Sequence, residues 1–290
     1  MQQTIIDGVR IDLCPPDEMD VNWVGNLDVL NQLLACWLRV HADDIPLHPR
    51  LIGRPGVGKT TLACAAAARL KRDVYIFQAT VDTRPEDLLI SPVLNQEGKI
   101  KYVASTLVTA MIRGGVAVLD EGNRMGEKSW ASLAPLLDHR RYIESIVAGV
   151  KIKAHSDFLF CTTMNEDAST FEVPEYIQSR LQPQIYIDFA DANEEAEIIK
   201  SNMPFAPDEI VDYVVHFLQR AHAADEPYSV RDGINITRLV LKLAAAEAER
   251  GNPSVKVSDK PILPRDMRTA LHSAVMGVLG DEALRYLSTD

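Results

Sequence analysis

The chain has 290 residues, of which 47% are hydrophobic and 24% charged, an ordinary globular composition for one large domain or two. The net charge of −11 disfavours nucleic-acid binding, which usually requires a basic face. No run of about 18 apolar residues occurs, so we expect no membrane insertion, and no secretory signal is visible. The four cysteines are far apart. This spacing fits a reducing, cytoplasmic location, and Cys64 and Cys161 are expected to be buried thiols.

Up to about residue 190, predicted strands alternate with predicted helices. Residues 1–22 resemble an irregular lead-in. Helices are expected at 26–40, 61–70, 85–89, 105–113, 127–138 and 174–181, strands at 48–52, 74–77, 116–119, 157–163 and 185–189, and hairpins at 91–103 and 141–153. This α/β alternation of five strands with helices predicts a mostly parallel sheet that helices cover on both faces.

From about Asp191 the pattern contains only helices. They are expected at 193–200, 208–224, 234–250 and 264–279. The change predicts a boundary near residue 190, with an α/β core at 23–190 and a smaller all-α domain at 191–290.

Residues 53–60 read G-R-P-G-V-G-K-T, which is a complete phosphate-binding loop. Glycines at Gly53, Gly56 and Gly58 let backbone N–H groups approach phosphate oxygens, Lys59 reaches the β- and γ-phosphates, and Thr60 offers its hydroxyl to Mg²⁺. The loop lies between an apolar strand and a helix, so the helix N-terminus adds to the anion site. The sequence therefore predicts a nucleoside triphosphate with Mg²⁺, and the remaining residues of the predicted binding set are Pro55, Val57 and Thr61.

Further candidates follow the buried strands. Asp120 and Glu121 end the strand at 116–119, where an Asp can hold the water shell of magnesium and a Glu can polarise a water for attack on the γ-phosphate. Asn165 ends the next strand, at the sheet edge where such folds bind ligands. Arg180 and Arg231 carry planar guanidinium groups that suit a phosphate. Taken alone, Asn165 could be a turn residue and each arginine a solvated side chain.

The order of these motifs resembles an AAA+ ATPase, and more narrowly the MoxR-type group related to midasin and the dynein-like ATPases. The narrower resemblance rests on the two hairpins and on residues 120–124, D-E-G-N-R, which are similar to the family motif D-E-x-N-R. It covers about Trp23 to Leu279. It implies a P-loop NTPase with a three-layer α/β/α core, a five-stranded parallel sheet and a small helical lid.

The resemblance also implies a role for each motif residue. Arg180 stands where the family places its arginine finger, which acts on the nucleotide of the neighbouring subunit. Val24 and Gly25 stand where an N-terminal segment packs on adenine. The other implied roles are Walker A for Lys59 and Thr60, Walker B for Asp120 and Glu121, sensor 1 for Asn165, and sensor 2 for Arg231.

Some positions depart from the family pattern. Gly122 replaces the usual apolar residue, Ser179 and Leu181 flank the arginine where many MoxR proteins have D-R-F, and Val230 stands where a Pro is usual. These departures concern the subgroup more than the ATPase assignment.

A finger supplied in trans contributes on the order of 10³ to 10⁵ in rate, so the resemblance implies a homo-oligomeric ring, expected to be a hexamer with head-to-tail contacts. The leading hypothesis is a chaperone-like motor that uses ATP to remodel a protein partner, such as a von Willebrand A domain protein. One alternative is a nucleic-acid motor or loader with Lys151 and Lys153 in its pore. Another is a nucleotide-gated scaffold in a signalling or defence complex, which the presence of Glu121 and Arg180 disfavours.

Overall fold

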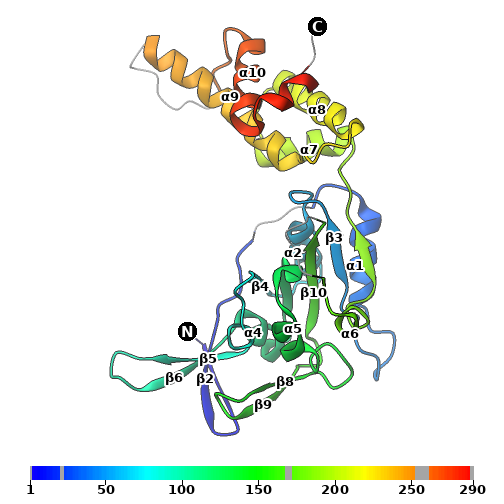
Figure 1. Cartoon of the computed structure of the whole chain (residues 1–290), viewed down its shortest axis with the longest axis vertical. Helices are drawn as coiled ribbons and strands as arrows, with labels where there is room; N and C mark the ends of the chain where they lie inside the picture. The colour runs from blue at the N-terminus through cyan, green and yellow to red at the C-terminus, as the bar shows by residue number, and fades with distance from the viewer. Residues whose placement is uncertain (1, 20–22, 167–171, 252–260, 288–290) are drawn as a thin grey trace. The chain divides into compact units, whose positions relative to one another are not determined.

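The computed structural model describes residues 2–19, 23–166, 172–251 and 261–287 (Figure 1). The chain divides into two compact units. The first consists of Met1–Trp23, Leu27–Gly53 and Gly58–Ile187, and the second of Val24–Asn26, Arg54–Val57 and Asp188–Asp290. Residues 20–22 of the predicted lead-in lie outside the described residues.

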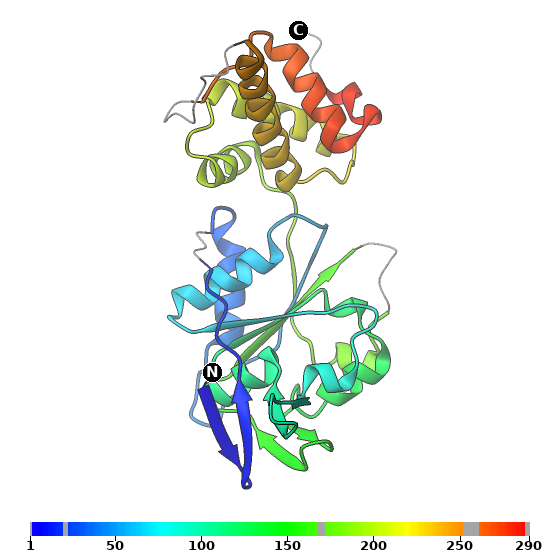
Figure 2. The same cartoon turned by 90° about the vertical axis from the view of Figure 1, so that its left-hand side faces the viewer.

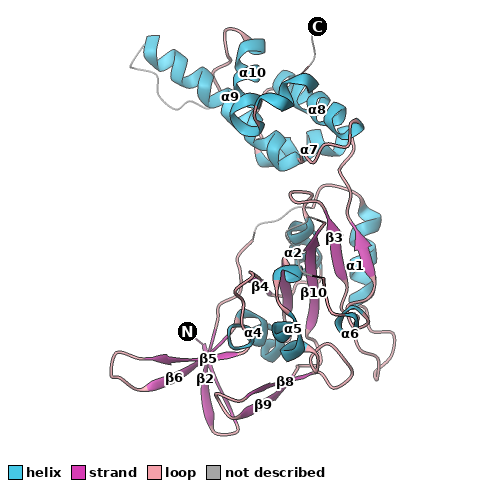
Figure 3. Ribbon diagram, in the orientation of Figure 1, coloured by secondary structure: helices cyan, strands magenta, loops and turns pink. Residues whose placement is uncertain are grey.

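Across the described residues, the first unit is built on a five-stranded sheet with the order β11-β3-β10-β7-β4. Figure 3 shows the strands in magenta and labels β3, β4 and β10 of this sheet. All of its pairings are parallel, which confirms the predicted sheet. The register places Asn165 beside Gly53 and Gln78 beside Asp120, so the strand ends that carry the motifs meet at one edge. The strands are β3 (Arg50–Gly53), β4 (Val74–Gln78), β7 (Val116–Asp120), β10 (Leu159–Asn165) and β11 (Gln184–Tyr186).

Helices cover both faces of this sheet (Figures 1 and 2). On one face, α1 (Leu27–Trp37) packs on α2 (Lys59–Arg69), and the thiol of Cys161 on β10 lies near those of Cys36 and Cys64 on these two helices. On the other face, α4 (Thr106–Arg113) packs on β4 and β7. Successive strand residues point to opposite faces, so strands buried on both sides are apolar throughout. The predicted three-layer core is confirmed, and Cys64 and Cys161 are buried free thiols as predicted.

Several helices are shorter than predicted. The helix expected at 127–138 ends at Leu133, because Pro135 cannot donate the next backbone hydrogen bond. The helix expected at 26–40 ends at Trp37, where the chain turns back and Leu47 N–H donates to the Cys36 carbonyl at 2.8 Å. The short elements of the first unit are α3 (Pro85–Leu88), the 3₁₀ turn η1 (Gly122–Arg124), α5 (Glu127–Leu133) and α6 (Glu175–Gln178).

The N-terminal segment is the main correction to the predicted fold. Residues 2–13 form an antiparallel hairpin, β1 (Gln2–Ile6) and β2 (Val9–Leu13), so the expected irregular lead-in is wrong there. Ile11 and Leu13 are fully or almost fully buried in the core. The signal was present in the sequence, because Asp7-Gly8 is a two-residue hairpin turn between strand-forming residues.

Both predicted hairpins are confirmed. β5 (Ile90–Leu94) pairs with β6 (Ile100–Ala104), and β8 (Tyr142–Ser145) pairs with β9 (Val150–Lys153). The first one is not an isolated insertion, because β6 also pairs in parallel with β2, and within the described residues these strands form a four-stranded sheet in the order β1-β2-β6-β5. The second packs into the core through Ile143, Val150 and Ile152.

The second unit is helical, as predicted for the C-terminal part. Its elements are α7 (Ala192–Asn202), α8 (Asp208–Ala223), α9 (Val230–Gly251), α10 (Met267–Leu279) and the 3₁₀ helix η2 (Asp281–Tyr286). Their apolar faces form one buried cluster. Asp191 caps α7 in a reciprocal capping box with Glu194. Within the described ranges, no helix combines the length and apolar character needed to cross a bilayer.

Candidate functional site

The loop between β3 and α2 bends back at two glycines. Gly56 has a φ of +85° and Gly58 a φ of +96°, a left-handed region that glycine adopts without steric cost. Gly58 is the N-cap of α2 and offers no side-chain cap, so the first N–H groups of this helix have no intrahelical acceptor. The loop therefore presents backbone donors and a positive helix end, which together suit a phosphate.

Lys59 is buried in this loop. Its residue is 6% exposed, and its Nζ donates to the Gly53 carbonyl at 2.8 Å. The ammonium group of Lys59 lies against the phosphate-binding loop, where it suits an anionic ligand.

Asp120 accepts hydrogen bonds from hydroxyl groups of two neighbouring elements. Its Oδ1 accepts from Thr60 Oγ1 on α2 at 2.6 Å and from Thr163 Oγ1 on β10 at 2.7 Å. Carboxylate and hydroxyl oxygens are the hard donors that Mg²⁺ prefers. The residues present thus fit a divalent cation, with Thr60 and Asp120 as the groups that would hold it directly or through its waters.

Glu121 occupies a constrained position beside Asp120. Its backbone has a φ of +54°, uncommon for a residue with a side chain, and its N–H donates to Thr163 Oγ1 at 2.8 Å. Its Oε1 accepts from Asn165 Nδ2 at 3.2 Å, and its Oε2 forms an ion pair with Arg124 Nε. The side chain is 31% exposed. A carboxylate that is fixed at both oxygens and still reached by solvent can accept a proton from water.

Asn165 is tied to the same turn. It is the last residue of β10 and 6% exposed. Its carbonyl accepts from Asn123 Nδ2 at 2.8 Å, and its N–H donates to Asn123 Oδ1 at 3.3 Å. The Asn123 amide therefore clamps the backbone of the strand end that carries Asn165.

The packing around Gly122 explains why this position has no side chain. A Cβ at this position would lie 2.3 Å from Thr162 Oγ1 and 3.0 Å from the ring of Trp130. The Trp130 side chain is completely buried and occupies this space. An apolar side chain at position 122 is therefore incompatible with this packing.

Arg180 contacts its own chain. Its Nε lies 3.5 Å from Asp138 Oδ2, and its guanidinium donates to the Tyr176 carbonyl and lies 5.9 Å from the centre of that ring. The hydrogen-bonded Arg140 guanidinium lowers the pKa of Asp138 to about 2, so this carboxylate is ionised at neutral pH.

The other predicted site residues lie in different places. Thr61 is the third residue of α2 in the first unit. The second unit contains five more of them, namely Val24, Gly25, Pro55, Val57 and Arg231. Within the second unit, Gly56 lies against the start of α9, because a Cβ on it would be 2.2 Å from Ser229 Oγ and 3.5 Å from Arg231 Cβ.

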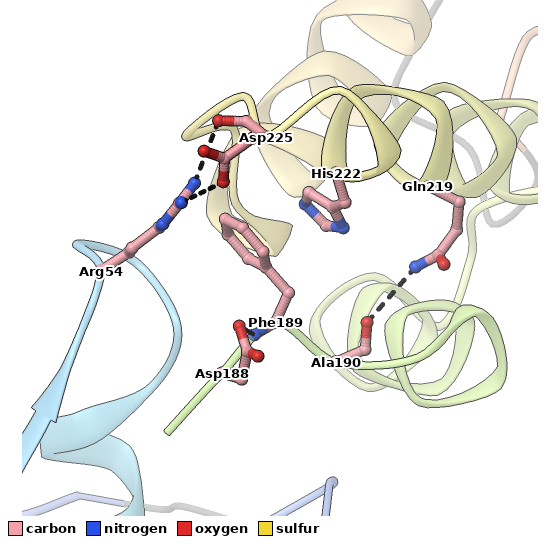
Figure 4. A pocket seen from close by; sticks show the side chains of 7 residues that line it. All are labelled: Arg54, Asp188, Phe189, Ala190, Gln219, His222 and Asp225. Atoms are coloured by element: carbon pink, nitrogen blue, oxygen red, sulfur yellow. Dashed lines mark hydrogen bonds and ion pairs between the residues drawn. The ribbon is translucent and has the colours of Figure 1, made fainter. Parts of the chain in front are cut away.

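The second unit also contains an open cavity of about 420 Å³ (Figure 4). Phe189 and His222 stack there with ring centres 3.8 Å apart. Arg54 lies over Phe189 at 5.1 Å and pairs with the carboxylate of Asp225. None of the predicted site residues lines this cavity.

Sequence reasoning missed the roles of Thr163, Asn123 and Arg124. The role of Thr163 could have been predicted, because this residue is two positions before Asn165 and side chains at that spacing share one face of a strand. The pairing of Arg124 with Glu121 depends on the 3₁₀ turn, which the sequence pattern did not reveal.

A glycine-rich loop between a parallel strand and a helix, together with an acidic pair at the end of another strand of the same sheet, defines a P-loop nucleoside triphosphatase. Comparison with known proteins narrows this class. Residues 50–181 match the family model of the AAA domain (dynein-related subfamily).

Curated relatives agree with that match. The protein CbbQ of Hydrogenophilus thermoluteolus is 25% identical over 244 residues, which is 81% of this chain and 87% of CbbQ. Midasin of Giardia intestinalis is 25% identical over 179 residues, or 61% of this chain and only 4% of midasin. The Holliday junction branch migration complex subunit RuvB of Thermotoga maritima is 23% identical over 268 residues, or 91% of this chain and 74% of RuvB.

A solved structure of the RuvB branch migration motor from Thermotoga maritima superposes with a TM-score of 0.55 at 18% identity, over 90% of this chain and 72% of that one. This likeness concerns the fold. Residues 50–181 thus carry an AAA domain of the dynein-related type. The chain has the fold of an AAA+ ATPase, and CbbQ and midasin are among the proteins that it resembles.

Proposed function

We propose that the chain binds ATP with Mg²⁺ and hydrolyses it in a homo-oligomeric ring, most simply a hexamer, to remodel a protein partner in the cytoplasm. Residues 23–190 would form the nucleotide-binding core and residues 191–290 its helical lid. The observation that carries the proposal is the Thr60–Asp120–Glu121–Asn165 network at the carboxyl edge of the sheet, beside the loop of Lys59.

Each side chain has a task in this proposal. Lys59 and the backbone N–H groups of residues 56–61 hold the phosphates, and Thr60 and Asp120 hold the cation, which neutralises charge on the phosphates when bound. Glu121 accepts the proton of the attacking water, and Asn165 orients it. Arg231 acts on the γ-phosphate in the same subunit, and Val24 and Gly25 pack on adenine.

Arg180 is proposed to act on the nucleotide of the neighbouring subunit. Its guanidinium is partly exposed, at 29% of the side chain, and is held by Asp138 and Tyr176 of its own chain. These contacts leave it oriented by its own subunit and available to a neighbour.

Mixing two inactive variants tests the proposal. Glu121→Gln should bind ATP without turning it over, and Arg180→Ala should lose turnover while ATP affinity changes little. If the finger acts in trans, mixing the two proteins restores activity, because an Arg180→Ala site receives Arg180 from its Glu121→Gln neighbour. Arg140→Ala, which removes the other arginine on Asp138, is the control and should keep turnover. Normal turnover by Arg180→Ala alone, or a mixture that stays inactive, would contradict the trans role.

The partner is proposed to be a protein. The resemblance to MoxR-type ATPases supports a client or adaptor outside this chain, with a von Willebrand A domain protein as the first candidate. Capture with Glu121→Gln and ATP, compared with the same variant without nucleotide, would identify it. Recovery of the same proteins in both samples would speak against a nucleotide-dependent client.

A nucleic-acid motor is the second candidate, because RuvB relatives match most of the chain. The net charge of −11 disfavours it. Of the two hairpin lysines considered for a pore, Lys151 has its ammonium 3.8 Å from the centre of the Tyr142 ring, where a cation–π contact holds it. Turnover that DNA or RNA stimulates, and that falls steeply with salt, would favour this alternative.

A further inference from the structure

Arg124, the last residue of the D-E-G-N-R turn, has no task in the proposed function. Its guanidinium Nε pairs with Oε2 of Glu121, three residues earlier in the same turn. The two side chains are partly exposed, 27% for Arg124 and 31% for Glu121. Ion pairs that solvent still reaches usually contribute little to stability, so stability is a weak explanation for this contact.

The contact belongs to a network that orients the Glu121 carboxylate from two sides. Asn165 Nδ2 donates to Oε1, whereas Arg124 pairs with Oε2. Both donors have fixed backbones, because Asn123 clamps Asn165 and the Arg124 N–H donates to the Glu121 carbonyl at 2.9 Å. The carboxylate therefore cannot rotate without losing one of two charge-assisted or amide contacts.

We propose that Arg124 is a positioning residue that holds the Glu121 carboxylate in the orientation in which it accepts a proton from the attacking water. This inference rests on the proposed role of Glu121. Each carboxylate oxygen has a second lone-pair site beyond the one that Asn165 or Arg124 uses. Fixing the base before the reaction removes the cost of orienting it in each turnover, and a misplacement of about 1 Å can cost on the order of 10²-fold in rate.

The test compares kcat with ATP affinity in the full, assembled chain. Arg124→Ala should lower kcat about 10-fold or more, while the Kd for ATP, measured by calorimetry, stays within about two-fold. Arg124→Lys keeps a cation but loses the planar fork, so it should recover part of the rate. Lys128→Ala, which removes an exposed cation four residues later on α5, is the matched control and should leave both quantities unchanged.

A double variant separates positioning from a structural role. In the Glu121→Gln background, Arg124→Ala should have no further effect on residual turnover, because its target carboxylate is gone. An unchanged kcat in Arg124→Ala contradicts the inference. So does a raised kcat, because Arg124 would then restrain Glu121 rather than position it, and so does an equal loss of rate and affinity.

The outcomes also separate this inference from the proposed function. If Glu121→Gln hydrolyses ATP at the normal rate, the role of Glu121 is wrong and both proposals fall. If Glu121→Gln is inactive and Arg124→Ala is fully active, only the role of Arg124 is wrong.

Discussion

Glu195 is the residue through which pH should act most strongly on the second unit. Its side chain on α7 is completely buried. Oε2 accepts from Gln219 Nε2 at 2.9 Å, whereas Oε1 has no hydrogen-bond partner among the described residues and lies 3.8 Å from His222 Nδ1. Gln219 and His222 appear side by side on α8 in Figure 4. Burial raises the pKa of Glu195 from 4.5 to about 7, with Asp191 acting in the same direction and the Gln219 hydrogen bond against it.

The sign of the effect follows from where the proton is held. Between pH 4.5 and about 7 the folded unit keeps a proton on Glu195 that the unfolded chain has lost, so the free energy of unfolding decreases as pH rises through this range. Above about pH 7 both states are ionised and the full penalty of the buried charge is present. The difference between the two pKa values corresponds to about 3 kcal/mol.

His222 acts in the opposite direction. Burial lowers its pKa, so folding disfavours its protonated form and stability decreases as pH falls below the ordinary value of 6.5. The short contact of its Nε2 with the Tyr228 carbonyl, at 2.6 Å, places the proton of the neutral ring on that nitrogen. Nδ1 is then an acceptor, and an amide at position 195 could donate to it.

Glu195→Gln should therefore stabilise the second unit by up to about 3 kcal/mol at pH 8 and by only about 1 kcal/mol at pH 5. Hydrogen exchange of the α7 and α8 peptides, compared with the wild type at the same pH, measures this, and protection at pH 8 should rise by up to about 100-fold. Glu197→Gln changes an exposed residue of the same helix and should stay within about 0.5 kcal/mol. A Glu195→Gln protein that is no more protected at pH 8, or equally so at pH 5 and pH 8, would refute the reasoning.

Three further predictions concern stability of the first unit, measured by denaturant or thermal unfolding. Gly122→Ala should destabilise by about 1–3 kcal/mol because its Cβ would collide with Thr162 and Trp130, whereas Gly126→Ala, which meets nothing within 4 Å, should change little. Asn123→Ala leaves the buried Asn165 carbonyl unpaired and should cost about 1–3 kcal/mol; a neutral result would show that water replaces the clamp. The Ser105 hydroxyl caps the N-terminus of α4 by accepting from the Val108 N–H at 3.1 Å. Ser105→Ala removes this cap and should lower the free energy of unfolding by about 1 kcal/mol, so an unchanged unfolding midpoint would contradict that role.

The parallel sheet and the helical second unit could be predicted because their signals are local. Strands buried on both faces, such as Val116–Asp120, are continuous apolar runs, and the helices of the second unit repeat their apolar residues at helical spacing. Helix ends were less predictable. The segment after Leu133 looks helical by composition, but Pro135 ends the helix because it has no N–H to donate.

The N-terminal hairpin illustrates a different limit. Its turn signal, Asp7-Gly8, is clear once the flanking residues are considered as strands. What the sequence could not indicate is the partner of β2, because that strand pairs with β6, about 90 residues later. Pairing over such a separation depends on the packing of Ile11 and Leu13 in the core and leaves no local pattern.

The departure at Gly122 shows how two positions must be considered together. By sequence alone, Gly122 is a missing apolar side chain in an otherwise matching motif, and Trp130 is an ordinary aromatic residue on a helix. In the fold, the Trp130 ring occupies the space that a side chain at 122 would need, and the turn still places Glu121 against Asn165 and Arg124. The loss of one side chain is compensated by another, so the departure preserves the geometry of the acidic pair and is no argument against a working site.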